Sequence, residues 1–151
     1  MGYSSVYCFK GGIPEWRAFN YPLTVSEEYA EIKIDKLSPR QVYDLLAADP
    51  GIYVLDVRPI DCSRENIFIR GAHICPMVYL DEWYHQIPRD ARIVVSDWTN
   101  KKAILAAKFL RSKGYQVLGV LKGGLVRWRA EKLAVVRVDG AITHDPALCE
   151  N

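Results

Sequence analysis

The chain lacks several features that would assign it to a specialised class of protein. Its 151 residues contain no apolar run near the roughly 20 residues that a membrane helix needs. A formal net charge of +2 gives no argument for binding to nucleic acid or to a membrane surface. The opening residues, MGYSSVYCFKGG, do not combine a basic segment with a long apolar one, as a secretory signal does. We therefore expect neither nucleic acid nor a membrane among the partners.

Cysteine is sparse and widely spaced, at Cys8, Cys62, Cys75 and Cys149. No two of these residues form a CxxC pair, and no Cys/His group has the spacing of a zinc site. The histidines are not spaced for a metal site or a catalytic triad either. We expect no metal and no cofactor, and we interpret the thiols as free and mostly buried. The compartment stays open, because cytoplasmic and periplasmic proteins are not separable on this basis.

What the chain does contain is an alternation of apolar runs with amphipathic segments. The runs IYVLDV, RIVVS and YQVLGV predict buried parallel strands at 52–57, 92–96 and 115–120. Shorter strands are expected at the end of 19–35 and near 73–75. Helices are predicted within 37–51, 78–87, 101–114 and 125–132. This alternation is typical of an α/β fold, with a mainly parallel sheet of about five strands and helices on both faces.

Details of two helices can be read from their residues. In the first, Ser38 is the expected N-cap, Pro39 takes the first helical position, and Gln41 closes a capping box. In the 101–114 helix, Gly114 is the expected C-cap. The side chains of this helix that we expect to face inward are Ile104, Ala107, Phe109 and Leu110.

The chain also contains an internal repeat. Residues 2–18, GYSSVYCFKGGIPEWRA, align without a gap with residues 114–130, GYQVLGVLKGGLVRWRA, and eight of the seventeen positions are identical. We interpret residues 1–23 as the terminal strand and helix of a preceding repeat, 24–33 as a linker, 34–136 as a complete domain and 137–151 as a tail. Cys8 then belongs in a core, and Trp16 and Trp128 are packing residues.

The first copy of the repeat has no sheet of its own within the sequence. A lone strand is not stable in water. Its strand must therefore pack on the domain, pair with another chain, or belong to a longer protein. Pairing with another copy would make residues 1–23 a self-association element.

Two junctions are the candidate functional positions of such a fold. Ligands of parallel α/β sheets bind at the carboxyl ends of strands. The first junction, LDVRP at 55–59, contains Asp56 and Arg58. The second junction, SDWTNKK at 96–102, joins a buried strand to a helix.

With these landmarks in order, the chain resembles the rhodanese (thiosulfate sulfurtransferase) domain over roughly residues 34–135. YVLDVRP is similar to the Asp-x-Arg strand end of that family, and IFIRGAHI is similar to its Gly-His-Ile-Pro-Gly-Ala segment at Ile69, Gly71 and Ala72. GYQVLGVLKGGLVRW resembles the closing signature, which the N-terminal GYSSVYCFKGGIPEW also carries. The resemblance implies a rhodanese-like three-layer sandwich and a piece of a tandem or multi-rhodanese protein.

The resemblance also implies a chemistry that this chain lacks at the usual loop. In the family, a loop cysteine takes a sulfane sulfur as a persulfide, within a cradle of backbone N–H groups at a helix N-terminus. Here Asp97 stands for that cysteine, Asn100 for a glycine and Lys102 for an arginine, and Ala103 replaces a serine. A carboxylate cannot hold a persulfide, but it can accept the same N–H bonds and cap the helix. We therefore expect a structural, regulatory or binding module without sulfur transfer at this loop.

Several alternatives stay open for the loop residues. Asp97 could act as a base or a phosphoryl acceptor instead of a cap. Lys101 and Lys102, with Thr99 beside them, could attract a small anion or a protein partner, or could simply be solvated. Trp98 could cover the pocket, contact a partner or pack against a neighbouring segment.

Two further alternatives concern the residues around the first junction. Asp56 and Arg58 could line the pocket or pair with each other. The alternative enzyme reading is a sulfurtransferase that uses Cys62, with Arg58 and Arg64 lowering its pKa, or the cysteine of a sister domain.

Overall fold

The computed structural model describes residues 5–24, 26–59 and 67–137. The chain divides into two compact units, one up to Glu31 and one from Ile32 onward. The first unit contains helices α1 (Gly12–Ala18) and α2 (Glu27–Glu31). None of the helices in these ranges is long and apolar enough to cross a membrane.

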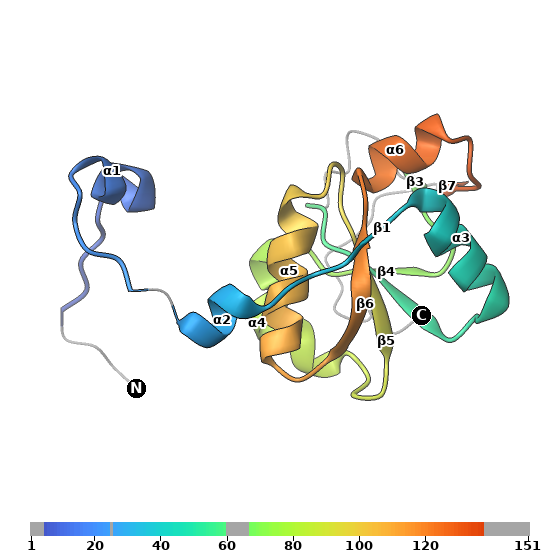
Figure 1. Ribbon diagram of the computed structural model, residues 1–151, viewed down its shortest axis with the longest axis horizontal. Helices are drawn as coiled ribbons and strands as arrows, with labels where there is room; N and C mark the ends of the chain where they lie inside the picture. The colour runs from blue at the N-terminus through green and yellow to red at the C-terminus, as the bar shows by residue number, and fades with distance from the viewer. Residues whose placement is uncertain (1–4, 25, 60–66, 138–151) are drawn as a thin grey trace. The chain divides into compact units, whose positions relative to one another are not determined.

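The second unit is built on a five-stranded sheet (Figure 1). The strand order is β1 (Lys36–Leu37), β6 (Gln116–Leu121), β5 (Arg92–Ser96), β2 (Ile52–Asp56) and β4 (Ala72–Ile74). Every neighbouring pair is parallel. The central strands β2, β5 and β6 are almost entirely buried, which is why their sequences are continuous apolar runs. The predicted α/β fold is confirmed.

Helices cover both faces of this sheet and make three layers (Figure 1). On one face, α3 (Pro39–Ala48) and α6 (Gly124–Ala130) pack through Val42, Leu125 and Trp128. On the other face lie α4 (Leu80–Trp83) and α5 (Lys101–Ser112). The predicted capping box of α3 is present: Gln41 N donates to Ser38 Oγ, and Ser38 N donates to Gln41 Oε1 at 2.8 Å.

The inward face of α5 differs in part from the prediction. Leu110 and Ala107 are fully buried as expected, but Ile104 and Phe109 are only partly buried. Ala103 and Ala106 are also 0% exposed. Small side chains allow the helix to lie close to the sheet, and the larger ones sit at its margins.

The helix predicted at 78–87 is broken into three short pieces. These are a 3-10 turn η1 (Met77–Tyr79), α4, and a second 3-10 turn η2 (Tyr84–Gln86). An α-helix would join the carbonyl of Tyr84 to the N–H of Pro88, but proline has none. The Tyr84 carbonyl instead accepts from the hydroxyl of Tyr115 at 2.7 Å and from Ile87 N at 3.2 Å.

Short elements account for the other differences. The strand expected at the end of 19–35 lies later, as β1 at Lys36–Leu37. Helix α2 forms in a region predicted as linker, where Ser26 Oγ accepts from Tyr29 N at 3.4 Å. A two-residue antiparallel pair, β3 (Ile67–Phe68) with β7 (Val136–Arg137), was not predicted.

The N-terminal unit lacks the strand expected in SSVYCF, because residues 5–9 have no regular structure. Cys8 is exposed, and Trp16 is half-buried instead of enclosed. A strand needs a neighbour to satisfy its backbone, and none lies beside these residues within the described part of their unit. In the second unit, Cys75 and Trp128 are buried as expected, 3% and 1% exposed.

Candidate functional site at the carboxyl ends of β2 and β5

The two candidate junctions meet at one edge of the sheet. Asp56 ends β2 and Ser96 ends β5, and these two residues are partners in the parallel ladder. Arg58 lies two residues after the end of β2, and Asp97 follows directly after the end of β5. Because the strands run in the same direction, their polar residues gather at the same edge.

The carboxylate of Asp97 lies at the N-terminus of α5 and accepts three backbone hydrogen bonds. Its Oδ2 accepts from Lys102 N at 2.7 Å and from Ala103 N at 3.1 Å. Its Oδ1 accepts from Asn100 N. The first N–H groups of a helix have no partner inside the helix. Asp97, only 4% exposed, therefore takes the donors that a bound anion would use.

The turn that makes this arrangement depends on Asn100. Its φ of 85° and ψ of 8° lie in the left-handed region, which asparagine adopts more readily than most residues other than glycine. After this turn the chain enters α5, and the N–H groups of Lys102 and Ala103 also reach the carboxylate of Asp97. The side-chain Oδ1 of Asn100 and the buried Oγ of Ser96 have no hydrogen-bond partner among the described residues.

The other side of the loop is held by α6. Leu125 N donates to the carbonyl of Asp97 at 2.8 Å, and Val126 N donates to the carbonyl of Trp98 at 3.2 Å. This approach requires a glycine at position 124, because a Cβ there would lie closer than 3.0 Å to those two residues' backbone atoms. The second glycine of the pair in the closing signature is therefore required by the packing of α6 against the loop.

The side chain of Arg58 is enclosed on several sides and is 5% exposed. Its Nε donates to Asp56 Oδ1 at 2.9 Å and to Oδ2 at 2.8 Å, and its Nη2 donates to the carbonyl of Ile67 at 2.8 Å. The guanidinium also lies 4.4 Å from the ring centre of Trp98 and 4.9 Å from that of Phe68. Asp56 and Arg58 thus pair with each other, and half-buried Trp98 covers the guanidinium.

Burial raises the pKa of the Asp56 carboxyl above its ordinary value of 3.8. The hydrogen bonds and charge of Arg58 oppose this rise in pKa, and the nearby charge of Asp97 adds to it. The guanidinium of Arg58 thus pairs with Asp56, whereas the carboxylate of Asp97 is held by backbone N–H groups.

A consequence is that Asp56 should stabilise the fold more at acid pH. A folded-state pKa above the unfolded one means that its contribution is fully present below about pH 3.8 and is lost as the pH rises through the folded pKa. The check is urea unfolding of the parent chain and of Asp56→Asn at several pH values. The free energy of unfolding of the parent minus that of the variant should fall as the pH rises. A difference that rises with pH would mean that the ion pair outweighs burial.

The remaining candidate residues are on the surface of the loop or outside the described ranges. Thr99, Lys101 and Lys102 are exposed. Cys62 and Arg64 lie outside the described residues, as does Cys149. Within the described ranges, no group of three His, Cys, Asp or Glu residues could hold a metal ion. The loop itself offers a capping carboxylate, two ammonium groups and no thiol.

Three contributors to the site were missed by sequence reasoning. Phe68 and the carbonyl of Ile67 come from the two-residue strand β3, which has no readable pattern. The glycine pair that includes Gly124 is visible in the sequence, since it occurs in both copies of the repeat. The contact of Gly124 with the loop could be found only from the structure.

A separate cavity of about 720 Å³ opens near the amino end of β2. Its lining includes Tyr43 from α3, Tyr53 from β2, His73 from β4 and Trp128 from α6. None of the described residues that line it carries a carboxylate or a thiol. It lies apart from the two junctions.

Comparison with known proteins identifies the family. The pattern of the Rhodanese-like domain family matches residues 38–131. Similar solved structures include a rhodanese-related protein from Thermoplasma volcanium, with 23% identity, a TM-score of 0.57, and coverage of 67% of this chain and 96% of that one. A full-length protein from Lactobacillus plantarum has 28% identity, a TM-score of 0.58, and coverage of 68% and 88%. The rhodanese-like domain of an Anabaena protein has 24% identity, a TM-score of 0.59, and coverage of 73% and 84%.

No curated protein matches the chain in the same comparison. The family match spans well over half of the 151 residues and includes both junctions and the closing helix α6. The chain belongs to the rhodanese-like domain family.

Proposed function

We propose that this rhodanese-like domain is a non-catalytic structural, regulatory or binding module. The observation that carries the proposal is the carboxylate of Asp97 on the backbone N–H groups at the start of α5. In the sequence, Asp97 stands where the family has its persulfide cysteine. A carboxylate offers no sulfur, and it occupies the N–H groups of Asn100, Lys102 and Ala103 that could otherwise hold a persulfide anion. Transfer of sulfur at this loop therefore has neither a carrier nor a cradle.

The outer face of the loop is the part left for a partner. Thr99, Lys101 and Lys102 are exposed there, next to half-buried Trp98. Arg58 is enclosed by its ion pair and two rings, so it cannot reach a ligand without breaking these contacts. The two lysines suit an acidic group of a protein or a small anion, which they would attract electrostatically as exposed point charges.

The test is an intact-mass spectrum after incubation with thiosulfate in the absence of reductant. We expect no adduct of one sulfur atom. Cys8 is exposed and could react without any catalytic site, so Cys8→Ser is the matched background variant. A stoichiometric sulfur on Cys62 that cyanide removes would overturn the proposal and make the chain a sulfurtransferase with its carrier at a new position.

A second variant places a thiol at the loop. Asp97→Cys is expected to give little transfer of sulfur from thiosulfate to cyanide, because Asn100 and Lys102 also depart from the family loop. Turnover at the level of an active family member, measured by thiocyanate formation, would show that the aspartate alone accounts for the loss of activity.

A further inference from the structure

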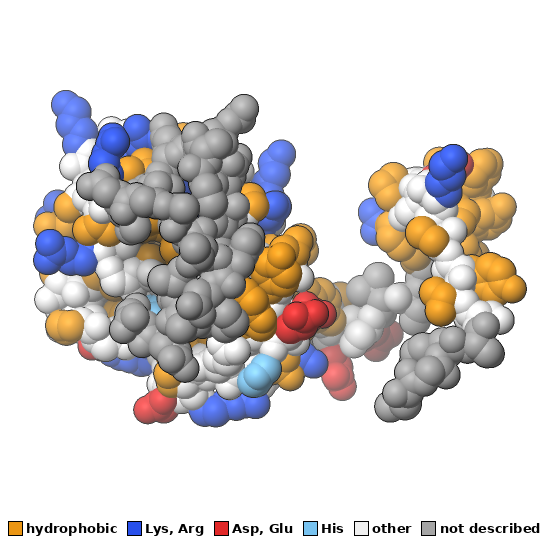
Figure 2. Space-filling model, turned by 180° about the vertical axis from the view of Figure 1, so that it is seen from behind, with side chains coloured by type: hydrophobic (Ala, Val, Ile, Leu, Met, Phe, Trp, Pro, Cys, Tyr) orange, Lys and Arg blue, Asp and Glu red, His pale blue; other side chains and the backbone are white. Residues whose placement is uncertain are grey.

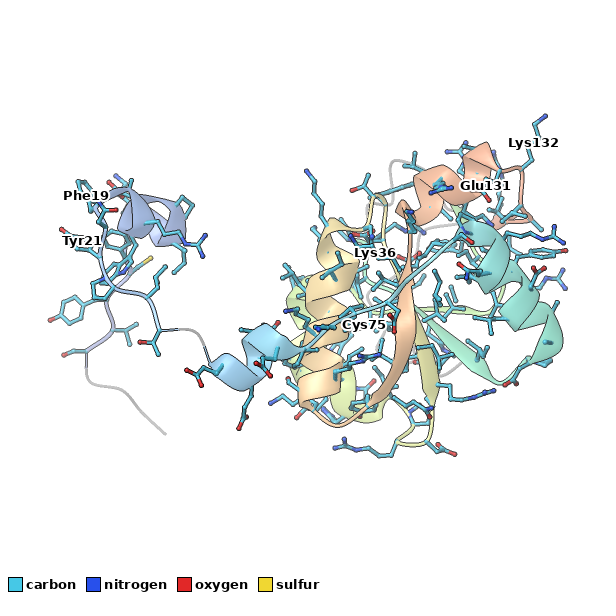
Figure 3. The ribbon with its side chains drawn as sticks, viewed as in Figure 1. Phe19, Tyr21, Lys36, Cys75, Glu131 and Lys132 are labelled. Atoms are coloured by element: carbon cyan, nitrogen blue, oxygen red, sulfur yellow. The ribbon has the colours of Figure 1, made fainter. Side chains whose placement is uncertain are left out.

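The N-terminal unit repeats the closing helix of the domain in conformation as well as in sequence. Helices α1 (Gly12–Ala18) and α6 (Gly124–Ala130) have the same length and correspond residue by residue at the repeat offset. Gly12 and Gly124, which begin them, both have a φ of 59°. Two residues after the helices, Asn20 and Lys132 have φ values of 55° and 57°. The ends of the two helices, at Phe19 and at Glu131 and Lys132, can be compared in Figure 3.

The side-chain hydrogen bond of the repeated tryptophan is also duplicated. Trp16 Nε1 donates to the carbonyl of Pro22 at 3.0 Å, and Trp128 Nε1 donates to that of Ala134 at 3.0 Å. The backbone bonds that end the helices correspond as well: Asn20 N to Arg17 O and Lys132 N to Arg129 O, both at 2.9 Å. Residues 12–22 thus fold as the closing helix and the turn after it do in the domain, whereas residues 5–9 do not form the strand that precedes it.

Burial is what distinguishes the two copies. In the domain, Val120, Leu121 and Leu125 are 0% exposed, and Trp128 is 1% exposed. In the first copy, Cys8 is exposed, and Phe9 and Ile13 are 45% and 54% exposed. Figure 2 shows orange side chains gathered over this small unit. The apolar positions that are buried in the core in the second copy are therefore exposed in the first copy.

The aromatic side chains of the first copy partly cover one another. The ring of Trp16 lies 5.3 Å from that of Phe9 and 5.0 Å from that of Tyr21. Tyr21 in turn lies 5.7 Å from Phe19, and both are labelled in Figure 3. These contacts leave Tyr21 and Phe19 48% and 58% exposed, so the cluster is not a substitute for a core.

We propose that residues 5–24 are the closing strand, glycine turn and helix of a second rhodanese-like sheet, and that the body of that sheet is encoded directly upstream in the same polypeptide. In the domain, Gly114 ends α5 with a φ of 84° and Tyr115 follows it. The pair Gly2–Tyr3 occupies the corresponding place in the repeat. The sequence repeat therefore begins at the position where α5 ends in the domain, so the counterpart of α5 belongs upstream.

A second copy of this chain does not offer the same binding place. Strand β6 already fills it, paired with β1 on one side and β5 on the other. Tyr7 also aligns with Gly119, where a Cβ would lie 2.8 Å from the carbonyl oxygen of Asp35. The sheet that takes up residues 5–9 must leave room for a tyrosine ring, so it differs from the sheet of this domain.

The first test is the intact mass and N-terminal sequence of the native polypeptide, purified from source cells with antibodies against this chain. We expect a mass above 17.2 kDa by at least one rhodanese-like body, with strands and helices that lead into Gly2. A native mass of 17.2 kDa, or unrelated sequence upstream, would overturn the proposal. So would a dimer of 17.2 kDa chains joined through residues 5–24.

The second test compares that native polypeptide with the 151-residue chain. Amide exchange at residues 5–9 is expected to slow by at least about a hundredfold in the longer polypeptide, because a paired strand exchanges only through larger openings. Ile13→Asn should lower the urea midpoint of the longer polypeptide and leave that of the 151-residue chain unchanged. Glu15→Asn, on the exposed side of the same helix, is the matched control and should change neither. Equal exchange in both polypeptides would contradict the proposed docking.

Discussion

Replacing Gly124 with alanine is expected to lower the free energy of unfolding by about 4 kcal/mol. The backbone at this position has a φ of 59°, which costs a residue with a Cβ about 1–2 kcal/mol. The new Cβ would also overlap the backbone of Asp97 and Trp98, and it would force the loop away from α6. The bonds from Leu125 N and Val126 N to the loop carbonyls would then lengthen or break, at about 1 kcal/mol each.

Gly71→Ala is the matched control for this prediction. Gly71 also has a positive φ, 74°, but a Cβ there would meet nothing within 4 Å. Its substitution should therefore cost only the backbone strain, about 1–2 kcal/mol. Equal losses for the two variants in urea unfolding would show that α6 and the loop separate easily, contrary to the close packing described above.

Removing the guanidinium of Arg58 is expected to be about as damaging. Arg58→Met leaves the carboxylate of Asp56 buried without its partner and close to the charge of Asp97. Breaking one side of a buried ion pair typically costs about 3–5 kcal/mol. The loss should be smaller at acid pH, because the pKa of Asp56 rises further without Arg58 and protonation removes the repulsion.

Two comparisons separate this effect from a general loss of packing. Adding Asp56→Asn to Arg58→Met removes the unpaired charge and should recover part of the lost stability at neutral pH. Arg40→Met breaks an exposed ion pair with Asp44 and should cost only about 0.3–0.5 kcal/mol. If the double variant is no more stable than Arg58→Met, the loss comes from the ring and carbonyl contacts of Arg58 and not from charge.

The parts of the fold that sequence predicts are those determined locally. The apolar runs at 52–57, 92–96 and 115–120 are strands because only a buried parallel strand suits so many consecutive apolar residues. The capping box at Ser38 and Gln41 involves residues three apart, so its pattern is visible without the fold. The break in the 78–87 helix has one local cause, Pro88, and one that the sequence does not reveal, the hydroxyl of Tyr115, which is distant in sequence.

The candidate site also has a part that the sequence predicts and a part that it does not. The position of Asp97 at a helix start follows from its neighbours, and so does the ion pair between Asp56 and Arg58, which are two residues apart. The rings that enclose Arg58 come from two other segments, and the contact of Gly124 with the loop joins residues far apart in sequence. Such contacts depend on the packing of whole elements, which a single sequence does not reveal.

Asp97 is covalently part of the loop that it orders. The order of the loop therefore does not depend on the concentration of anions in solution. A diffusing anion would fill the cradle at α5 in proportion to its concentration, and the loop would be ordered only when that anion was abundant. A carboxylate carried by the same loop has an effective concentration fixed by the covalent chain. It cannot be diluted, depleted or displaced by dialysis. The surface formed by Trp98, Thr99, Lys101 and Lys102 therefore keeps one geometry whatever the supply of anions around it.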